Sequence, residues 1–155
     1  MTDSNHLALD NQICFALYAA NRAVTARYRP LLSALGLTYP QYLVMLVLWE
    51  TTQGDERVRV SDLGKRLRLD SGTLTPLLKR LEEQGLVRRR REAADQRVVL
   101  LDLTEQGRSL RARAETLPAR LLCDSGVAPD RAAALRDELR ALLNELEGGA
   151  SSSAR

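Results

Sequence analysis

Apolar residues recur every three or four positions over the first part of the chain, which is the spacing of an amphipathic helix. The pattern predicts a helix that Asp10 or Asn11 caps and that runs to about Tyr28, with Leu35-Gly36 as its stop. A second run, YLVMLVLW, is apolar nearly all round, so we expect a buried helix at the centre of the core.

The start of this central helix carries a capping box. Thr38 and Gln41 have the spacing at which each side chain can bond the other's backbone N–H group. Pro40 lies in the first turn, where its missing N–H group costs nothing. The helix is expected to run through Thr51 and to end at Gly54.

Two short helices are predicted next. After an extended segment at 57–60, Ser61 caps the helix SDLGKRL, and three residues later DSGTLTPLLKRLEEQG begins another, which Gly85 stops. Because Pro76 is awkward inside a helix, regular hydrogen bonding is expected to start near Thr73. Two short helices joined by a tight turn are typical of a helix-turn-helix.

The helical period is lost between residues 86 and 103. LVRRRREAADQRVVLLDL predicts two strands around a polar tip at Asp95-Gln96-Arg97. Thr104 then caps a long helix to about Leu122, which Gly126 ends, and a last helix covers 130–146. The expected fold is mainly α with a small β-hairpin: one domain with a winged helix-turn-helix at 38–103, flanking helices at 9–35 and 104–147, and a disordered tail at 148–155.

Charge is concentrated in the winged segment. Residues 57–97 hold twelve Lys or Arg against six Asp or Glu, whereas the whole chain has a net charge of only +3. A basic segment in an otherwise acidic chain favours double-stranded DNA as partner over a winged helix used for protein contact alone. Hydroxyl groups can donate to phosphates or base edges, cations can bind phosphates, and an acidic neighbour can hold an arginine extended toward the minor groove. The candidate DNA contacts are Ser71, Thr73, Thr75, Lys79, Arg80, Asp95 and Arg97.

Enzyme, metal and cofactor signatures are poor. His6 is the only histidine, which removes Ser-His and Cys-His dyads and any histidine metal site. No phosphate-cradling glycine loop is visible, and two cysteines are too few for a disulfide framework. With no signal peptide and no apolar run of membrane-spanning length, we expect a cytoplasmic protein without a membrane partner, metal or cofactor.

Four blocks of the sequence carry a family resemblance. LDNQICFALYAANRA, LGLTYPQYLVMLVLWE, LDSGTLTPLLKRLEEQGLV and the D-x-R…LT pattern of the hairpin resemble the multiple antibiotic resistance regulator (MarR) family, and within it the organic hydroperoxide resistance regulator (OhrR) branch. The resemblance implies a homodimeric winged-helix repressor that dimerises through its terminal helices, binds a DNA operator and responds to organic hydroperoxides.

Cys14 is the candidate redox sensor. It lies close to a predicted helix start, where free N–H groups and the helix dipole favour a thiolate that can attack a peroxide. The resemblance implies hydrogen bonds to this sulfur from Tyr28 and Tyr39 of the partner subunit, with Tyr18 matching a third family tyrosine. It also implies a resolving cysteine of the other subunit at Cys123, although one-cysteine members instead form a mixed disulfide with a small thiol.

Two other readings of the sequence stay open. A regulator of the same architecture could bind a small aromatic ligand, in which case the cysteine would be incidental. A thiol peroxidase could use Cys14 for turnover, but such an enzyme would not obviously need a basic hairpin.

Overall fold

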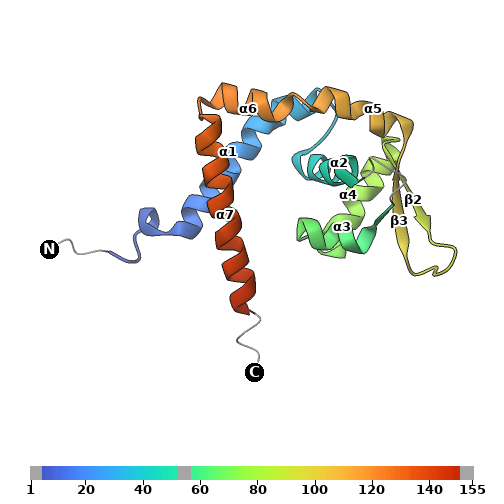
Figure 1. The fold of residues 1–155 in the computed structure, drawn as a ribbon, viewed down its shortest axis with the longest axis horizontal. Coiled ribbons are helices and arrows are strands. Elements are labelled where there is room, and N and C mark those ends of the chain that lie inside the picture. Colours follow the sequence, from blue (N-terminus) through green and yellow to red (C-terminus); the bar gives the residue numbers. More distant parts are fainter. Residues whose placement is uncertain (1–4, 52–56, 151–155) are drawn as a thin grey trace. The chain divides into compact units, whose positions relative to one another are not determined.

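The structure, a computed structural model, describes residues 5–51 and 57–150 and divides into two compact units, 1–115 and 116–155. Figure 1 shows the helices and strands of both units. The first contains the short 3-10 turn η1 (Leu9–Asn11), α1 (Ile13–Ser33), α2 (Tyr39–Thr51), β1 (Val58–Arg59), α3 (Val60–Leu67), α4 (Ser71–Glu83), β2 (Val87–Arg91), β3 (Val99–Leu103) and α5 (Glu105–Ala114). The second contains α6 (Leu117–Ser125) and α7 (Pro129–Ala150). The predicted class, mainly helical with a small antiparallel wing, is confirmed.

The wing is a three-stranded antiparallel sheet with the strand order β1-β3-β2. Strands β2 and β3 form the predicted hairpin, in the register that pairs Val87 with Leu103. The extended segment predicted at 57–60 supplies the third strand, because β1 pairs with the other edge of β3 and sets Val58 opposite Leu101. All four of these side chains are buried, which explains why the short β1 joins the sheet.

The core of the first unit is built around α2, as the apolar run predicted. Val44, Met45 and Leu48 of α2 are fully buried, and the Nε1 atom of Trp49 donates to the carbonyl oxygen of Gly107 in α5 at 2.9 Å. The predicted capping box is present at the start of α2. The N–H group of Thr38 donates to Oε1 of Gln41 at 2.9 Å, and the N–H group of Gln41 donates to Oγ1 of Thr38 at 3.4 Å.

Helix α1 differs from its predicted bounds at both ends. Asp10 and Asn11 belong to η1 instead of capping α1, whose N-cap is Gln12 without a side-chain hydrogen bond. The helix continues past Tyr28 to Ser33, because Pro30 removes only one backbone hydrogen bond and the following turn is anchored by buried Leu32. The predicted stop is present, and Gly36 adopts the left-handed conformation with φ +70°.

The helix-turn-helix is present with two shifted helix starts. Ser61 lies inside α3, whose N-cap is Arg59, so the predicted Ser61 cap is wrong. Helix α4 begins at Ser71 and not near Thr73, because the Asp70 side chain accepts a hydrogen bond from the Thr73 N–H group at 2.7 Å and so caps the first turn. Gly54, the predicted end of α2, lies outside the described residues.

The predicted helix from Thr104 to Leu122 is two helices. The Thr104 cap is confirmed, since its Oγ1 accepts from the Gly107 N–H group at 3.0 Å, but α5 ends at Ala114 and α6 begins at Leu117. Pro118 explains the break, because it fits the first turn of a new helix and would disrupt the interior of a continuous one. Gly126, with φ +68°, ends α6 as predicted.

The last helix is longer than predicted at its C-terminal end. Helix α7 continues through residues 148–150, which were expected to be part of a disordered tail, while residues 151–155 lie outside the described part. Among the described residues, no helix is long and apolar enough to cross a membrane.

Candidate functional site

Helix α4 separates an apolar face from a polar one, as predicted. Leu74, Leu78 and Leu81 are buried against the core. The predicted contact residues flank this face or lie opposite it, and all of them are exposed: Ser71, Thr73, Thr75, Lys79 and Arg80. The hydrogen bond from the Thr73 N–H group lowers the pKa of the Asp70 carboxyl group, so the cap remains charged at neutral pH. The fold therefore provides a rigid helix whose hydroxyl groups and cations face solvent.

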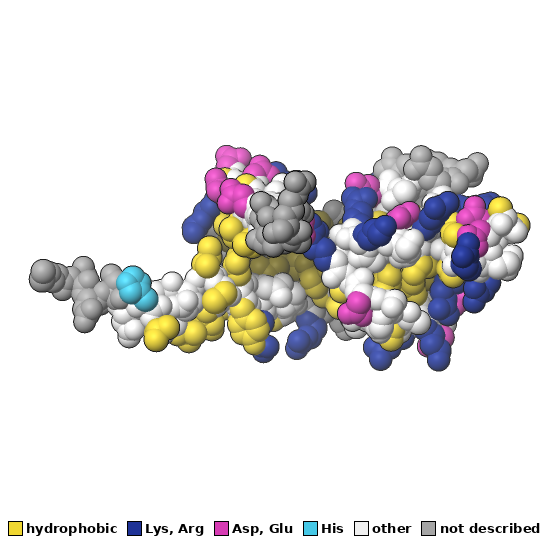
Figure 2. Space-filling model, turned by 90° about the horizontal axis from the view of Figure 1, so that it is seen from below, with side chains coloured by type: hydrophobic (Ala, Val, Ile, Leu, Met, Phe, Trp, Pro, Cys, Tyr) yellow, Lys and Arg dark blue, Asp and Glu magenta, His cyan; other side chains and the backbone are white. Residues whose placement is uncertain are grey.

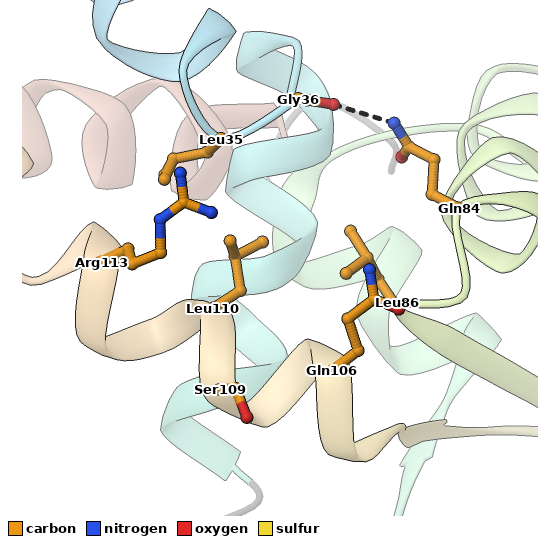
Figure 3. Close-up of a pocket in the computed structure, with 8 residues that line it drawn as sticks. All are labelled: Leu35, Gly36, Gln84, Leu86, Gln106, Ser109, Leu110 and Arg113. Atoms are coloured by element: carbon orange, nitrogen blue, oxygen red, sulfur yellow. Dashed lines mark hydrogen bonds between the residues drawn. The ribbon is translucent and has the colours of Figure 1, made fainter.

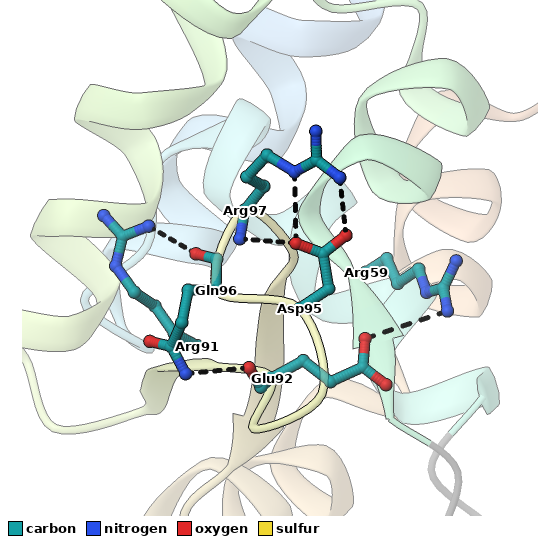
Figure 4. Close-up of polar contacts among 6 residues, drawn as sticks. All are labelled: Arg59, Arg91, Glu92, Asp95, Gln96 and Arg97. Carbon is teal, nitrogen blue, oxygen red and sulfur yellow. Dashed lines mark hydrogen bonds and ion pairs between the residues drawn. The ribbon is translucent and has the colours of Figure 1, made fainter.

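The tip of the wing holds one arginine in a solvent-exposed position beside a carboxylate (Figure 4). The Arg97 side chain is 91% exposed, and its Nε atom lies 3.2 Å from Oδ1 of Asp95. The same carboxylate oxygen accepts from the Arg97 backbone N–H group at 3.0 Å. These hydrogen bonds lower the pKa of Asp95, which therefore keeps its charge and restrains the guanidinium group.

Polar contacts behind the tip stiffen the turn of the wing. The Arg91 Nη1 atom donates to the carbonyl oxygen of Gln96 at 2.7 Å, and the Gln96 side chain donates to the carbonyl oxygen of Glu92 at 3.0 Å. Glu92 lies 3.8 Å from Arg59 of β1, so the turn is connected to the neighbouring strand (Figure 4). Sequence reasoning identified the tip residues but not this support.

The arginines of β2 are partly neutralised by acids that the sequence pattern did not reveal. Arg89 forms an ion pair with Glu82 of α4 at 2.8 Å and lowers the pKa of that carboxyl group, chiefly through its backbone N–H group. Arg90 pairs with Asp102 of β3 at 2.7 Å. Figure 2 shows Lys and Arg side chains gathered over the part of the first unit that carries the wing. The basic run thus connects α4 to the wing as well as supplying surface charge.

Cys14 is an exposed free thiol at the second residue of α1. The first N–H groups of a helix have no intrahelical partner, and the N-cap Gln12 supplies no side-chain cap. Apolar side chains next to the cysteine are also uncovered, since Ile13 is 65% exposed and Leu17 is 36% exposed. A small apolar molecule could therefore reach a sulfur atom that lies in the positive end of a helix dipole.

Tyr28 of α1 forms a cluster of tilted rings with Tyr39 and Tyr42 of α2. The ring centroid of Tyr28 lies 5.4 Å from that of Tyr39 and 5.6 Å from that of Tyr42, which contacts Trp49 in turn. Burial raises the pKa of Tyr28 and of Tyr39, and it raises the pKa of Tyr42 to about 12. All three phenols therefore keep their protons at neutral pH and can act as hydrogen-bond donors.

A single chain does not bring Cys14 together with Tyr28 and Tyr39. Fourteen residues separate Cys14 from Tyr28 along the same helix, which is about 21 Å at the helical rise of 1.5 Å per residue. Contact between the thiol and the tyrosine cluster within one subunit is therefore excluded by the length of α1.

Tyr18 lies one turn from Cys14 and is oriented by an arginine. The Arg22 guanidinium carbon lies 5.5 Å from the centre of the Tyr18 ring, and its Nη1 atom donates to the phenol oxygen at 3.3 Å. Tyr18 is 57% exposed, and its ring centroid lies 6.5 Å from that of Phe15, the residue after Cys14. Sequence reasoning selected Tyr18 but missed Arg22.

Cys123 is a second exposed free thiol, near the C-terminal end of α6 in the second unit. The described residues contain no group of three or more His, Cys, Asp or Glu side chains that could hold a metal ion.

Comparison with known proteins identifies the family. Residues 26–113 match the family model described as transcriptional regulator SarA/Rot. The chain is 46% identical over 142 residues to the organic hydroperoxide resistance transcriptional regulator of Bacillus subtilis (strain 168), covering 92% of this chain and 94% of that protein. It is 49% identical over 146 residues to the HTH-type transcriptional regulator TtmR of Methylorubrum extorquens (strain PA1), covering 94% and 73% respectively.

Solved structures of AbfR, a protein of Staphylococcus epidermidis, are also similar. Reduced AbfR bound to DNA matches with a TM-score of 0.71 at 35% identity, covering 89% of this chain and 94% of that one. The disulfide-formed AbfR matches with a TM-score of 0.60 at 36% identity, covering 87% and 92%. The family consists of transcriptional regulators and not of enzymes. The chain belongs to the MarR/SarA family of winged-helix, DNA-binding transcriptional regulators.

Proposed function

We propose that this protein is a homodimeric repressor that releases its operator when an organic hydroperoxide oxidises Cys14. The observation that carries the proposal is the exposed thiol at the start of α1, in a helix turn without a side-chain cap and among uncovered apolar side chains. The name of the Bacillus subtilis relative supports the choice of effector.

In this proposal α4 enters the major groove of the operator and the wing contacts the neighbouring backbone and minor groove. The hydroxyl groups of Ser71, Thr73 and Thr75 donate to phosphates or base edges, and Lys79 and Arg80 bind phosphates. Arg97, hydrogen-bonded to Asp95, enters the minor groove, where the negative potential attracts a guanidinium group. The DNA-bound form of the relative AbfR supports this assignment.

Uncovered apolar side chains support dimerisation through the terminal helices. Of the residues of α1, only Leu32 is buried in the single chain, while Leu135 and Leu146 of α7 are 57% and 64% exposed. Apolar surface of this extent usually marks a protein interface. We therefore assign residues 9–35 and 104–147 to dimerisation and 38–103 to DNA binding.

A second subunit would also complete the sensor. Because about 21 Å of helix separates Cys14 from Tyr28 in one chain, the tyrosines that bond the thiolate would be the partner subunit's Tyr28 and the partner subunit's Tyr39. Their protonated phenols can donate to sulfur, and Tyr18 lies one turn from Cys14 on the same face of α1.

The chemistry needs one peroxide and no cofactor. The Cys14 thiolate attacks the terminal oxygen of the hydroperoxide, a sulfur–oxygen bond forms as the oxygen–oxygen bond breaks, and the alkoxide takes a proton and leaves as the alcohol. Sulfur is oxidised by two electrons and the peroxide is reduced by two. A second thiol then attacks the sulfenic acid, which forms a disulfide and releases water.

We propose the partner subunit's Cys123 as this second thiol. Its exposed position at the end of α6 allows approach, and a disulfide form is known for AbfR. Since a disulfide needs Cα atoms about 4.4–6.8 Å apart, its closure would fix the dimer in one arrangement. Two recognition helices must lie roughly 34–36 Å apart to match one turn of DNA, so a modest rotation would release the operator.

The test uses a fluorescent duplex that the purified protein selects from random-sequence DNA. Cumene hydroperoxide should release the wild-type protein, and a thiol reductant should restore binding. Cys14→Ser should bind the duplex normally and resist release, whereas full release of Cys14→Ser at the same peroxide concentration would refute the sensor.

Non-reducing gels distinguish the two routes to the final oxidised state. The intersubunit route predicts a reducible dimer band that is absent from both Cys14→Ser and Cys123→Ser. Full release of wild-type protein that stays monomeric on such a gel would favour a mixed disulfide with a small thiol.

A further inference from the structure

Two helices of the first unit end against each other. Gly36 and Gly85 have φ values of +70° and +73°, so each adopts the left-handed conformation that often follows a helix end. In both turns the N–H group of the following leucine donates to the carbonyl oxygen of the residue five positions earlier. The Leu37 N–H group donates to the carbonyl oxygen of Leu32 at 3.1 Å, which closes the end of α1. At the end of α4 the Leu86 N–H group donates to the carbonyl oxygen of Leu81 at 3.0 Å.

Side chains from α4 and α5 bind the last carbonyl groups of α1. The Nε2 atom of Gln84, the C-cap residue of α4, donates to the carbonyl oxygen of Gly36 at 2.8 Å (Figure 3). The Nη2 atom of Arg113 in α5 donates to the carbonyl oxygen of Ala34 at 2.8 Å. Ala34 is the C-cap of α1, whose last carbonyl groups have no intrahelical donor, and Gly36 lies two residues beyond it in the turn. The two side chains therefore bind acceptors at and just after the end of α1.

The turn after α4 is fixed on its other side. The Thr104 hydroxyl group donates to the carbonyl oxygen of Gly85 at 2.6 Å, and the Thr104 N–H group donates to that of Leu86 at 3.1 Å. Helix α5 passes so close that a Cβ atom on Gly107 would lie 2.1 Å from the Leu86 oxygen. The turn between α4 and β2 is therefore rigidly attached to α5 and to the base of the wing.

The contact between α1 and α4 is far less packed. A cavity of about 400 Å³ lies beside it, with Leu35, Leu86 and Leu110 among its lining residues (Figure 3). Beside this cavity, the Gln84 side chain supplies the hydrogen bond that links the turn after α1 directly to the C-cap of α4. Breaking that one bond would let the end of α1 move with little steric hindrance from α4.

We propose that Gln84 is a positioning residue that couples α1, the helix carrying Cys14, to α4, the helix that reads DNA. This coupling rests on the proposed function for its signal, the oxidation of Cys14. A shift of α1 carries the Gly36 carbonyl group with it and so moves the C-terminal end of α4. Without the Gln84 donor, the remaining side-chain link from the end of α1 to this turn runs through Arg113 and α5, so movement of α1 is transmitted to α4 more weakly.

The test compares Gln84→Met with Gln106→Met in the full-length protein. Gln106 lines the same cavity from α5, and the structure gives it no hydrogen bond to α1, so it controls for the loss of a glutamine there. Gln84→Glu is a second variant, because its carboxylate has the same shape but cannot donate to a carbonyl group. Circular dichroism checks that each variant is folded.

Two measurements are made on the selected DNA duplex. The first is the ratio of dissociation constants after and before cumene hydroperoxide, which should fall about fivefold in both Gln84 variants and stay unchanged in Gln106→Met, because about fivefold corresponds to one neutral hydrogen bond. The second is hydrogen–deuterium exchange of residues 32–37 in reduced protein, which the duplex should slow in wild type and Gln106→Met only.

The two measurements separate the coupling from the sensor. A Gln84→Met variant that matches Gln106→Met in either measurement overturns the role of Gln84. If peroxide fails to release even the wild-type protein, the proposed sensor is wrong, and the exchange measurement alone decides whether Gln84 couples α1 to α4.

Discussion

Replacement of Thr104 by valine should destabilise the first unit by about 2 kcal/mol. The Thr104 hydroxyl group caps α5 by accepting from the Gly107 N–H group at 3.0 Å, and it donates to the carbonyl oxygen of Gly85 at 2.6 Å. Loss of a threonine N-cap costs about 1 kcal/mol, and loss of a neutral hydrogen bond costs about 1 kcal/mol more. Valine has nearly the same shape, so the loss reflects the hydroxyl group and not a cavity.

Urea unfolding followed by circular dichroism measures the effect, at one protein concentration because the stability of the proposed dimer would depend on concentration. With a slope of about 2 kcal/mol per molar urea, the midpoint should fall by about 1 M. Thr104→Ser keeps the hydroxyl group and should lie much closer to wild type. A loss below about 0.5 kcal/mol in Thr104→Val, or an equal loss in both variants, would refute this reading of the junction.

Three further outcomes are expected. Arg97→Ala should weaken binding to the selected duplex and flatten its salt dependence, whereas Arg108→Ala on α5 should leave the salt slope unchanged. The Thr73 N–H group lowers the pKa of Asp70 in the folded protein, so the Asp70 carboxylate stabilises the fold above about pH 3.9. This stabilisation is lost as the pH falls through the pKa of Asp70 in the folded state, and Asp70→Asn should therefore lose less stability than wild type in acid unfolding. Burial raises the pKa of Tyr42 to about 12, so its protonated phenol adds stability that is present below about pH 10 and is lost as the pH rises toward 12. Absorbance titration should find the Tyr42 phenol ionising last, and its ionisation near pH 10 would contradict its burial.

Local chemistry allowed much of the fold to be predicted from the sequence. The capping pair Thr38 and Gln41 and the Thr104 cap depend on residues within a few positions of one another, and both are present. The glycine stops within the described residues, Gly36, Gly85 and Gly126, are present as well. The errors arose where two local signals competed. Pro76 indicated a late start for α4, but the Asp70 cap sets an earlier one.

For the predicted site residues, the single chain shows the exposure of each side chain but no contact with DNA or a second subunit. The α4 hydroxyl groups and the wing tip are exposed as expected, because helix and hairpin periodicity determines which side chains face solvent. By contrast, Gln84 bonds Gly36 across 48 positions of sequence, and no periodic pattern predicts such a contact. The proposed pairing of Cys14 with tyrosines of a partner subunit depends on a second chain and remains a prediction.

The most direct test follows DNA release and Cys14 oxidation in the same sample. A reduced protein–duplex complex is treated with less than one equivalent of cumene hydroperoxide, fluorescence anisotropy records release, and mass spectrometry of quenched aliquots records the oxidised fraction of Cys14. The account predicts that release rises in step with oxidation of Cys14 and that both reverse when thiol is added. Release that precedes Cys14 oxidation, or oxidation of Cys14 in proportion to the added peroxide while the duplex stays bound, would contradict it.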